Sequence, residues 1–241
     1  MSAPTTALRP ASREALKRVS TATLTTVLFK RGFRNVFIQG VFLLSKNPPR
    51  MVGEAYTLRY IPAREDVDQL GAFEGRGHPQ REAIEACPPG HVLMMDARRD
   101  ASAATGGDIL MTRLMVRGVA GVVTDGGLRD SPTIEQLPWP AYCAARSAPL
   151  NLVRHHAVDS QVPIGCGGVP VYPGDIVVGD AEGVVVIPGN IANEVAEEGA
   201  SQTVFEDWVE ARVKEGRSIF GLYPPSPETR AEFEAWKKSK K

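Results

Sequence analysis

The fold is decided by residues 91–130, HVLMMDARRDASAATGGDILMTRLMVRGVAGVVTDGGLRD. Two apolar runs in it, His91 to Ala97 and Val119 to Asp125, are typical of strands buried on both faces of a sheet. Between them, Asp108 to Arg117 has helical spacing and Gly118 follows it. A strand, a helix and another strand form a βαβ unit, which is right-handed in nearly all folds. The stretch therefore predicts an α/β protein with a parallel sheet.

Further elements are expected on both sides of this unit. Before it we expect an amphipathic helix over 12–31, with Ser12 as N-cap and Gly32 just past its end, and a strand over 53–61. Residues 63–80 are polar with three glycines and predict a loop with a short helix, able to order over a ligand. After the unit we expect a β-meander (169–172, 175–179, 183–187), a helix over 191–215 and a Pro-rich, charged tail on the surface or on a partner. One α/β domain over residues 1–222 is expected, with the C-terminal tail over 223–241.

Charge is balanced over the whole chain but not along it. The 241 residues hold 28 Lys and Arg and 28 Asp and Glu, which argues against a generally basic nucleic-acid binder. Residues 1–59 nevertheless hold ten Lys and Arg against Glu14 and Glu54, so this segment carries +8 and the remaining 182 residues −8. We weigh an RNA-binding N-terminus against a basic surface that meets acidic surface of a neighbouring subunit, and favour the second.

Cysteine content and hydropathy exclude other classes. The three cysteines, Cys87, Cys143 and Cys166, are an odd number without CxxC spacing, which argues against a disulfide framework and a structural zinc site. Apolar runs are far shorter than the roughly 20 residues of a membrane-spanning helix, and the N-terminus lacks a signal-peptide pattern. We therefore expect a soluble cytoplasmic protein without a membrane partner.

Two glycine-bearing loops are the candidate site. In Thr105-Gly106-Gly107-Asp108, the glycines allow close approach of a ligand, and the helix that follows leaves amide N–H groups free for an anion. The other interpretation is a tight turn with Asp108 as a first-turn acid. In Asp125-Gly-Gly-Leu-Arg129-Asp130, Arg129 suits a carboxylate or enolate oxygen and Asp130 is a hard oxygen ligand for magnesium. A surface ion pair is the other interpretation here.

The remaining chemically active side chains favour no other mechanism. His155 and His156 are adjacent and cannot share a helix face, and His78 and His91 have no metal-ligand spacing around them. Cys166 lies in a glycine-rich loop, but no base is placed for it by sequence, and Cys87 and Cys143 are expected in or near the core.

Together the two loops resemble the RraA-like family, which contains class II 4-hydroxy-4-methyl-2-oxoglutarate/4-carboxy-4-hydroxy-2-oxoadipate aldolases and the regulator of ribonuclease activity A. The resemblance lies in Gly107-Asp108-Ile-Leu, in Arg129-Asp130, and in Arg117-Gly-Val-Ala-Gly-Val-Val123 between them. It extends to 20–25, 53–59 and 168–188, and covers roughly residues 15–222.

The resemblance implies a single-domain α/β/β sandwich similar to the phosphohistidine swivelling-domain fold, in trimers or hexamers with active sites between subunits. It assigns the carboxylate-binding loop to Gly107, Asp108, Ile109 and Leu110. It implies that Arg129 contacts the substrate and that Asp130 holds a divalent metal, Mg²⁺ or Mn²⁺. Glu206 is the candidate acid that a neighbouring subunit brings to the metal waters. Three features depart from the family pattern: the segment 96–100, whose Arg98 and Arg99 are expected to bring cations near the pocket, the longer 63–80 insert, and the longer tail after Gly221.

The expected activity is a metal-dependent lyase that cleaves a 4-hydroxy-2-oxo acid to pyruvate, with oxaloacetate decarboxylation as a side activity. Asp108, through water, is the candidate for proton transfer, and Arg129 stabilises the enolate. The alternatives are a non-catalytic regulator of an RNA-processing enzyme and a dehydratase or hydrolase of a sugar-derived 2-oxo acid in the same pocket.

Overall fold

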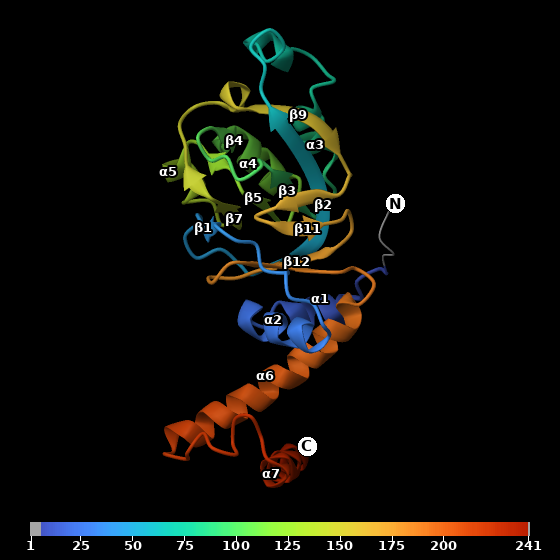
Figure 1. Cartoon of the computed structure of the whole chain (residues 1–241), viewed down its shortest axis with the longest axis vertical. Coiled ribbons are helices and arrows are strands. Elements are labelled where there is room, and N and C mark those ends of the chain that lie inside the picture. Colours follow the sequence, from blue (N-terminus) through green and yellow to red (C-terminus); the bar gives the residue numbers. More distant parts are fainter. Residues whose placement is uncertain (1–5, 241) are drawn as a thin grey trace.

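The computed structural model describes residues 6–240 and shows a mixed α/β fold, which confirms the predicted class (Figure 1). Its helices are α1 (Pro10–Leu16), α2 (Thr21–Lys30), α3 (Pro79–Ala86), α4 (Asp108–Val116), α5 (Ser131–Ile134), α6 (Ala192–Lys214) and α7 (Pro227–Ser239), with 3₁₀ turns η1 (Leu70–Phe73) and η2 (Asn151–Val153). Its strands are β1 (Phe42–Leu43), β2 (Met51–Pro62), β3 (Val92–Asp96), β4 (Ala104–Gly106), β5 (Gly121–Thr124), β6 (Gly127–Leu128), β7 (Ala141–Cys143), β8 (Ala145–Arg146), β9 (His155–Ser160), β10 (Ile164–Cys166), β11 (Val169–Val171), β12 (Ile176–Gly179) and β13 (Val184–Ile187).

The central sheet has the order β1-β7-β5-β3-β2-β12-β13, and β9 pairs with the C-terminal half of β2. Strands β2, β3, β5 and β7 are parallel, whereas β12 and β13 are antiparallel to their neighbours. The βαβ unit is confirmed, since β3 and β5 are hydrogen-bonded neighbours with α4 between them in the chain. A second, three-stranded sheet, β4-β6-β8, continues from the ends of these strands.

Both faces of the central strands are covered, which explains their continuous apolar runs. Leu93 and Met95 of β3 belong to a buried cluster with residues of α3 and α4, while Val92 and Met94 face a cluster that includes β10, β11 and β13. All four of these side chains are 0% exposed. A strand buried on both faces has no polar alternation, so a solid apolar run is the expected pattern.

The helix predicted over 12–31 is wrong in one respect, because it is two helices. α1 ends at Leu16 and α2 begins at Thr21, with Ser20 as its N-cap: the Ser20 hydroxyl accepts from the Thr23 amide at 3.0 Å. The predicted N-cap Ser12 instead lies buried inside α1. Gly32 follows α2 with a φ of +89°, as a residue past a helix end often does.

The predicted three-stranded meander is also wrong in part. β12 and β13 form the expected hairpin. β11, however, pairs with the strand before it, β10, and the two are joined by a turn at Gly167 and Gly168, both of which have positive φ. Sequence periodicity does not show which neighbour a short strand pairs with. The β10–β11 hairpin therefore covers the central sheet instead of extending its edge.

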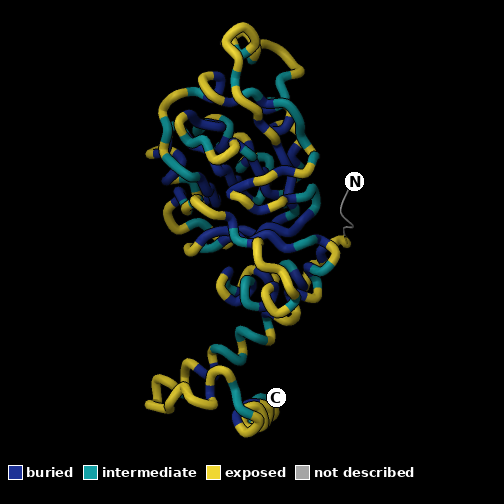
Figure 2. Tube along the Cα trace, viewed as in Figure 1, coloured by how far each residue is buried: buried dark blue, intermediate teal, exposed yellow. Residues whose placement is uncertain are grey.

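The C-terminal residues form a helical arm. Figure 1 shows α6 running away from the body, with α7 at its far end. Phe233 of α7 packs against Phe205 and Trp208 of α6, with ring centroids 5.1 and 5.5 Å apart. Much of this arm is exposed along its length (Figure 2).

The basic N-terminal segment meets acidic surface of its own chain. Arg31 pairs with Glu194 and Glu198 of α6 at 2.9 and 2.6 Å, and Arg9 pairs with Glu197 at 2.7 Å. The sequence interpretation placed the acidic surface on a neighbouring subunit, and for these pairs that placement is wrong. In residues 6–240 we find no helix long and apolar enough to span a membrane.

Candidate active site

The two glycine-bearing loops meet at the ends of β4 and β6. These strands are parallel neighbours, with Gly106 opposite Leu128, and the Arg129 amide donates to the Gly106 carbonyl at 3.1 Å. Gly107 then leads into α4 and Asp130 into α5. The predicted convergence of the two loops is therefore confirmed.

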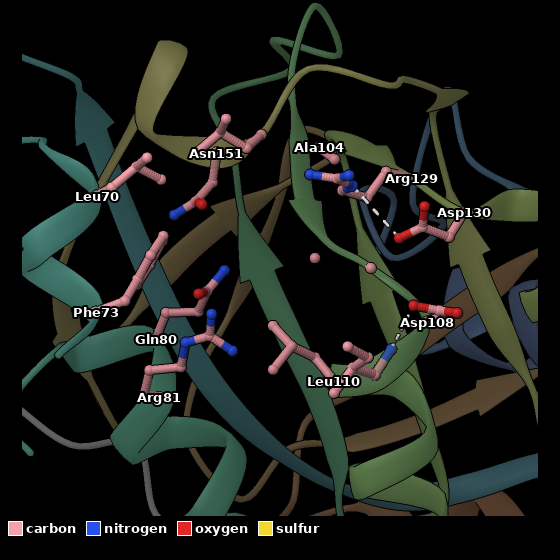
Figure 3. A pocket seen from close by; sticks show the side chains of 14 residues that line it. Leu70, Phe73, Gln80, Arg81, Ala104, Asp108, Leu110, Arg129, Asp130 and Asn151 are labelled. Carbon is pink, nitrogen blue, oxygen red and sulfur yellow. Dashed lines mark hydrogen bonds and ion pairs between the residues drawn. The ribbon is translucent and has the colours of Figure 1, made fainter. Parts of the chain in front are cut away.

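Between these loops and the 63–80 insert lies a pocket of about 330 Å³. Figure 3 shows Asp108, Arg129 and Asp130 on one side of it and Leu70, Phe73, Gln80 and Asn151 on the other. All the residues that the sequence assigned to the site within one chain line this pocket, namely Gly107, Asp108, Ile109, Leu110, Arg129 and Asp130.

The amide groups of the first loop are only partly free. The Ile109 amide donates to Asp108 Oδ1 at 2.7 Å, and the Leu110 amide donates to the Gly107 carbonyl at 3.1 Å. Among the described residues, the amides of Gly107 and Asp108 have no hydrogen-bond partner. Because a helix N-terminus carries partial positive charge, these two amides are the ones that can hold an anion.

Arg129 and Asp130 are held close together and remain accessible. Arg129 Nε lies 3.3 Å from Asp130 Oδ2, and the two side chains are 42% and 39% exposed. Asp130 has a left-handed backbone, with a φ of +54°, which aspartate tolerates better than most residues. A Cβ placed on Gly107 would lie 2.6 Å from Asp130 Oδ2, so only a glycine leaves room here for the Asp130 carboxylate.

These residues fit a magnesium-type ion better than a zinc-type ion. In residues 6–240 no three His, Cys, Asp or Glu side chains gather as a ligand cage. Magnesium, by contrast, is commonly bound by one or two carboxylates and completes its shell with water and substrate oxygens. Asp130, whose side chain lines the pocket and is 39% exposed, matches that donor set, and Asp108 lies on the same side of the pocket (Figure 3).

Glu206 lies outside this pocket within its own chain. It is on α6, where Oε2 accepts from the Thr23 hydroxyl at 2.7 Å and Oε1 from the Gln202 amide at 2.9 Å. Its assigned role requires a neighbouring subunit and stays a prediction.

Arg98 and Arg99, which we expected near the pocket, are not among the residues that line it. Arg98 donates to the Arg154 carbonyl at 2.9 Å and lies 3.2 Å from His155 Nδ1. Arg99 is directed towards Gly168, where a Cβ would meet its guanidinium. Both have positive φ, and the loop is fixed by the buried Asp125, which accepts from the Ala97 amide at 2.6 Å.

The far wall of the pocket was predicted only in part, through the 63–80 segment that we expect to order over a ligand. It consists of Leu70 and Phe73 from the predicted loop, Gln80 and Arg81 from α3, and Asn151 from η2. A signal for α3 exists in the sequence: Pro79 suits the first helical position, and Ala83 and Cys87 are spaced four residues apart. The single amides Gln80 and Asn151 belong to no motif.

The histidines and thiols offer no competing site. His155 is 0% exposed, and burial lowers its pKa, while His156 Nδ1 lies 2.7 Å from Asp68 Oδ1. Burial raises the pKa of the Cys87 and Cys143 thiols to about 12 and that of Cys166 well above its usual range. Cys166 is therefore not a reactive thiol.

We expect none of the three thiols to react with a disulfide reagent in the native protein at pH 8, since the thiolate is the reacting form and all three side chains are buried. Ellman's reagent should report no thiol under native conditions and three after unfolding in guanidinium chloride. If one thiol reacted rapidly with the reagent in the native protein, that result would contradict the buried placement of these side chains.

Comparison with known proteins agrees with this architecture. Residues 21–186 match the family model RraA-like, described as Aldolase/RraA. A Halalkalibacterium halodurans protein, whose name gives 4-hydroxy-4-methyl-2-oxoglutarate aldolase as a proposed activity, is 39% identical over 108 residues, which are 44% of this chain and 50% of that protein. The match thus spans half the length of that relative.

Two solved structures share the fold. A Streptomyces coelicolor protein, RraAS2, described as an unusual member of the RNase ES inhibitor RraA family, has a TM-score of 0.75 at 29% identity, covering 86% of this chain and 99% of that one. A Pseudomonas syringae protein has a TM-score of 0.80 at 23% identity, covering 91% and 96% of the two chains. The second likeness concerns the fold alone. The finer comparison with a swivelling domain stays a prediction.

Proposed function

Because this chain belongs to the RraA-like family, we propose that it is a divalent-metal-dependent lyase that cleaves a 4-hydroxy-2-oxo acid to pyruvate. The observation that carries this proposal is the meeting of three groups in one pocket: free amides at Gly107 and Asp108, the Arg129 guanidinium and the Asp130 carboxylate. A 2-oxo acid presents a carboxylate, a carbonyl oxygen and a developing enolate, which these groups match in charge.

Binding and orientation come from the chain's own residues. In this proposal the amides of Gly107 and Asp108 bind the substrate carboxylate, and Arg129, which lines the same pocket, donates to the 2-oxo oxygen. Asp130 would hold Mg²⁺ or Mn²⁺ through its carboxylate oxygens, with the rest of the ion's shell left to water and substrate oxygens. When bound, such an ion supplies positive charge that stabilises an enolate oxygen.

Cleavage requires one proton to leave the substrate and one to return. The 4-hydroxyl loses its proton, the C3–C4 bond breaks, C4 becomes a carbonyl carbon, and the electron pair forms the enolate of pyruvate. Arg129 stabilises the enolate oxygen, and protonation at C3 releases pyruvate. Asp108, half-buried at the pocket wall, moves the proton through water. Loss of carbon dioxide from oxaloacetate gives the same enolate, so the pocket supports decarboxylation too.

The assay that tests this proposal is pyruvate release from 4-hydroxy-2-oxoglutarate and from oxaloacetate, coupled to lactate dehydrogenase. We expect both reactions with Mg²⁺ or Mn²⁺, loss of both in EDTA, and recovery when excess metal is restored. Calcium is the matched control ion, because its larger radius and flexible shell suit this small donor set less well. Activity that persists in EDTA would overturn the metal-dependent mechanism.

A second candidate function is supported by the likeness to RraAS2, an unusual member of the RNase ES inhibitor RraA protein family. In that case the protein would bind an RNA-processing enzyme without catalysis. Inhibition of a ribonuclease by protein that releases no pyruvate from any 2-oxo acid would favour this function. We also propose that the chain forms a trimer or hexamer in which Glu206 of one subunit approaches the pocket of the next.

A further inference from the structure

The pocket wall opposite Asp108 and Asp130 holds two buried amide side chains with unused hydrogen-bonding atoms. Gln80 is 2% exposed and Asn151 is 6% exposed. Among the described residues, Gln80 Oε1 has no donor and Asn151 Nδ2 has no acceptor. Leaving such a group unpaired costs about 1–3 kcal/mol, so partners are expected at this wall.

The orientation of the Gln80 carboxamide is fixed by its other end. Gln80 Nε2 donates to the Thr105 carbonyl at 2.6 Å and to the Tyr60 hydroxyl at 3.3 Å. An amide nitrogen is required there, because a carbonyl oxygen can only accept. Oε1 is therefore the atom that lacks a hydrogen-bond donor among the described residues.

Asn151 contributes the complementary group from a different element. It begins η2, and its side chain lines the same pocket as Gln80 (Figure 3). One wall thus offers an acceptor at Gln80 and a donor at Asn151. A hydroxyl group both donates and accepts, so it can satisfy both atoms. A carboxylate has no proton for Gln80, and a methyl group satisfies neither atom.

We propose that Gln80 and Asn151 form a subsite for a hydroxyl group that lies beyond C4 of the substrate. This inference rests on the proposed lyase function, in which the carboxylate end of the substrate occupies the opposite side of the pocket. The substrate class is then a polyhydroxylated, sugar-derived 2-oxo acid, and the second product of cleavage is a hydroxyaldehyde. The 4-hydroxyl is left to Asp108, because the Gln80 subsite binds the hydroxyl on the next carbon.

Neighbouring side chains suit a short polar tail. Arg81 forms no ion pair among the described residues, and its guanidinium lies 4.6 Å from the centre of the Phe73 ring. Leu70, 72% exposed, and Phe73 come from the insert, which is attached to β9 through the Asp68–His156 contact. These apolar side chains bound the pocket on the side of the insert, and Gln80 and Asn151 supply its hydrogen bonds.

The catalytic test compares two substrates that differ in one hydroxyl, 4-hydroxy-2-oxopentanoate and 4,5-dihydroxy-2-oxopentanoate. We expect kcat/KM to be at least tenfold higher for the dihydroxy acid, because a site built to bind a hydroxyl disfavours the analogue that lacks it. In Gln80→Met this ratio should fall to about one while the monohydroxy acid is still cleaved. Tyr60→Phe is the matched control: it removes the other contact of Gln80 Nε2, leaves Oε1 unchanged, and should keep the ratio.

Binding distinguishes failure of this inference from failure of the lyase function. The probes are 2-oxopentanoate and 5-hydroxy-2-oxopentanoate, which lack the 4-hydroxyl and cannot undergo the cleavage. In titration calorimetry, the wild type should bind 5-hydroxy-2-oxopentanoate about tenfold more tightly than 2-oxopentanoate. Gln80→Met should bind the two acids with equal affinity. Equal binding of the two acids to the wild type, or a preference for 4-hydroxy-4-methyl-2-oxoglutarate in the kinetic assay, would overturn the subsite. Absence of all cleavage with the binding preference intact would overturn only the lyase function.

Discussion

Asp130→Asn is expected to reduce kcat/KM for pyruvate release by roughly 10³-fold and to abolish measurable Mn²⁺ binding. The substitution removes one negative charge from a side chain that lines the pocket and lies against Gly107. It keeps the size of the side chain and a residue type that tolerates the left-handed backbone at φ +54°. The thermal midpoint should therefore change little. Metal binding is measured by electron paramagnetic resonance of Mn²⁺, and turnover by the coupled pyruvate assay.

Asp159→Asn is the matched control for this experiment. Asp159 also pairs with an arginine, Arg59, and its side chain is 43% exposed against 39% for Asp130. It lies on β9, outside the pocket, so its loss should leave metal binding and turnover unchanged. If Asp130→Asn retained turnover within tenfold of the wild type, Asp130 would not be the metal ligand.

The parts of the fold that were predictable are those fixed by local pattern. The apolar runs of β3 and β5 are recognisable because both faces of each strand are buried, and Gly118 ends the preceding helical segment where a positive φ of +78° is needed. The two loops follow from this arrangement, because parallel strands place their carboxyl ends at one edge.

The parts that were not predictable depend on contacts distant in sequence. The helical spacing of 12–31 continues across the break at residues 17–20 because α1 and α2 both bury apolar side chains in one cluster with α6. The N-terminal charge excess is visible in the sequence, but nothing local shows that Arg31 meets Glu194 and Glu198 of the same chain. The pairing of β11 with β10 likewise depends on packing against the central sheet, which the local sequence does not show.

The candidate site divides in the same way. Gly107, Arg129 and Asp130 stand in loops whose residue types indicate their chemistry. Gln80 and Asn151 are recognisable only in the folded chain, because one atom of each amide group has no hydrogen-bond partner among the described residues. An unsatisfied buried atom is a property of three-dimensional packing, and no sequence spacing reports it. The hydrogen-bonding capacity of the wall with Gln80 and Asn151 was therefore hidden in the sequence, while the charged groups of the two loops were not.

Gly107→Ala is expected to reduce kcat/KM at least 10²-fold with little loss of stability. The φ of Gly107 is −126°, which alanine adopts without strain. The new Cβ would lie 2.6 Å from Asp130 Oδ2 and 3.0 Å from Arg129 Cγ, so these two side chains must move. Both are at least one-third exposed and can move at small cost to folding, but in moving they leave the substrate position.

Gly165→Ala is the control glycine, because a Cβ there meets nothing within 4 Å. Its turnover and thermal midpoint should equal those of the wild type. A Gly107→Ala protein with full turnover would contradict the placement of Asp130 beside Gly107, and one that loses its cooperative unfolding would show that the glycine serves folding instead.

The double variant Gly107→Ala/Asp130→Asn separates displacement of the carboxylate from other effects of the methyl group. If the methyl group acts by moving Asp130, it has little left to disturb once the charge at Asp130 is gone. The losses of kcat/KM caused by Gly107→Ala and by Asp130→Asn should then not be additive. The double variant should be about as active as Asp130→Asn alone. Full additivity would mean that the methyl group acts elsewhere, on the Arg129 side chain or on the amides of Gly107 and Asp108. In that case metal binding would survive in Gly107→Ala, whereas displacement of Asp130 weakens it, and the Mn²⁺ measurement distinguishes the two explanations.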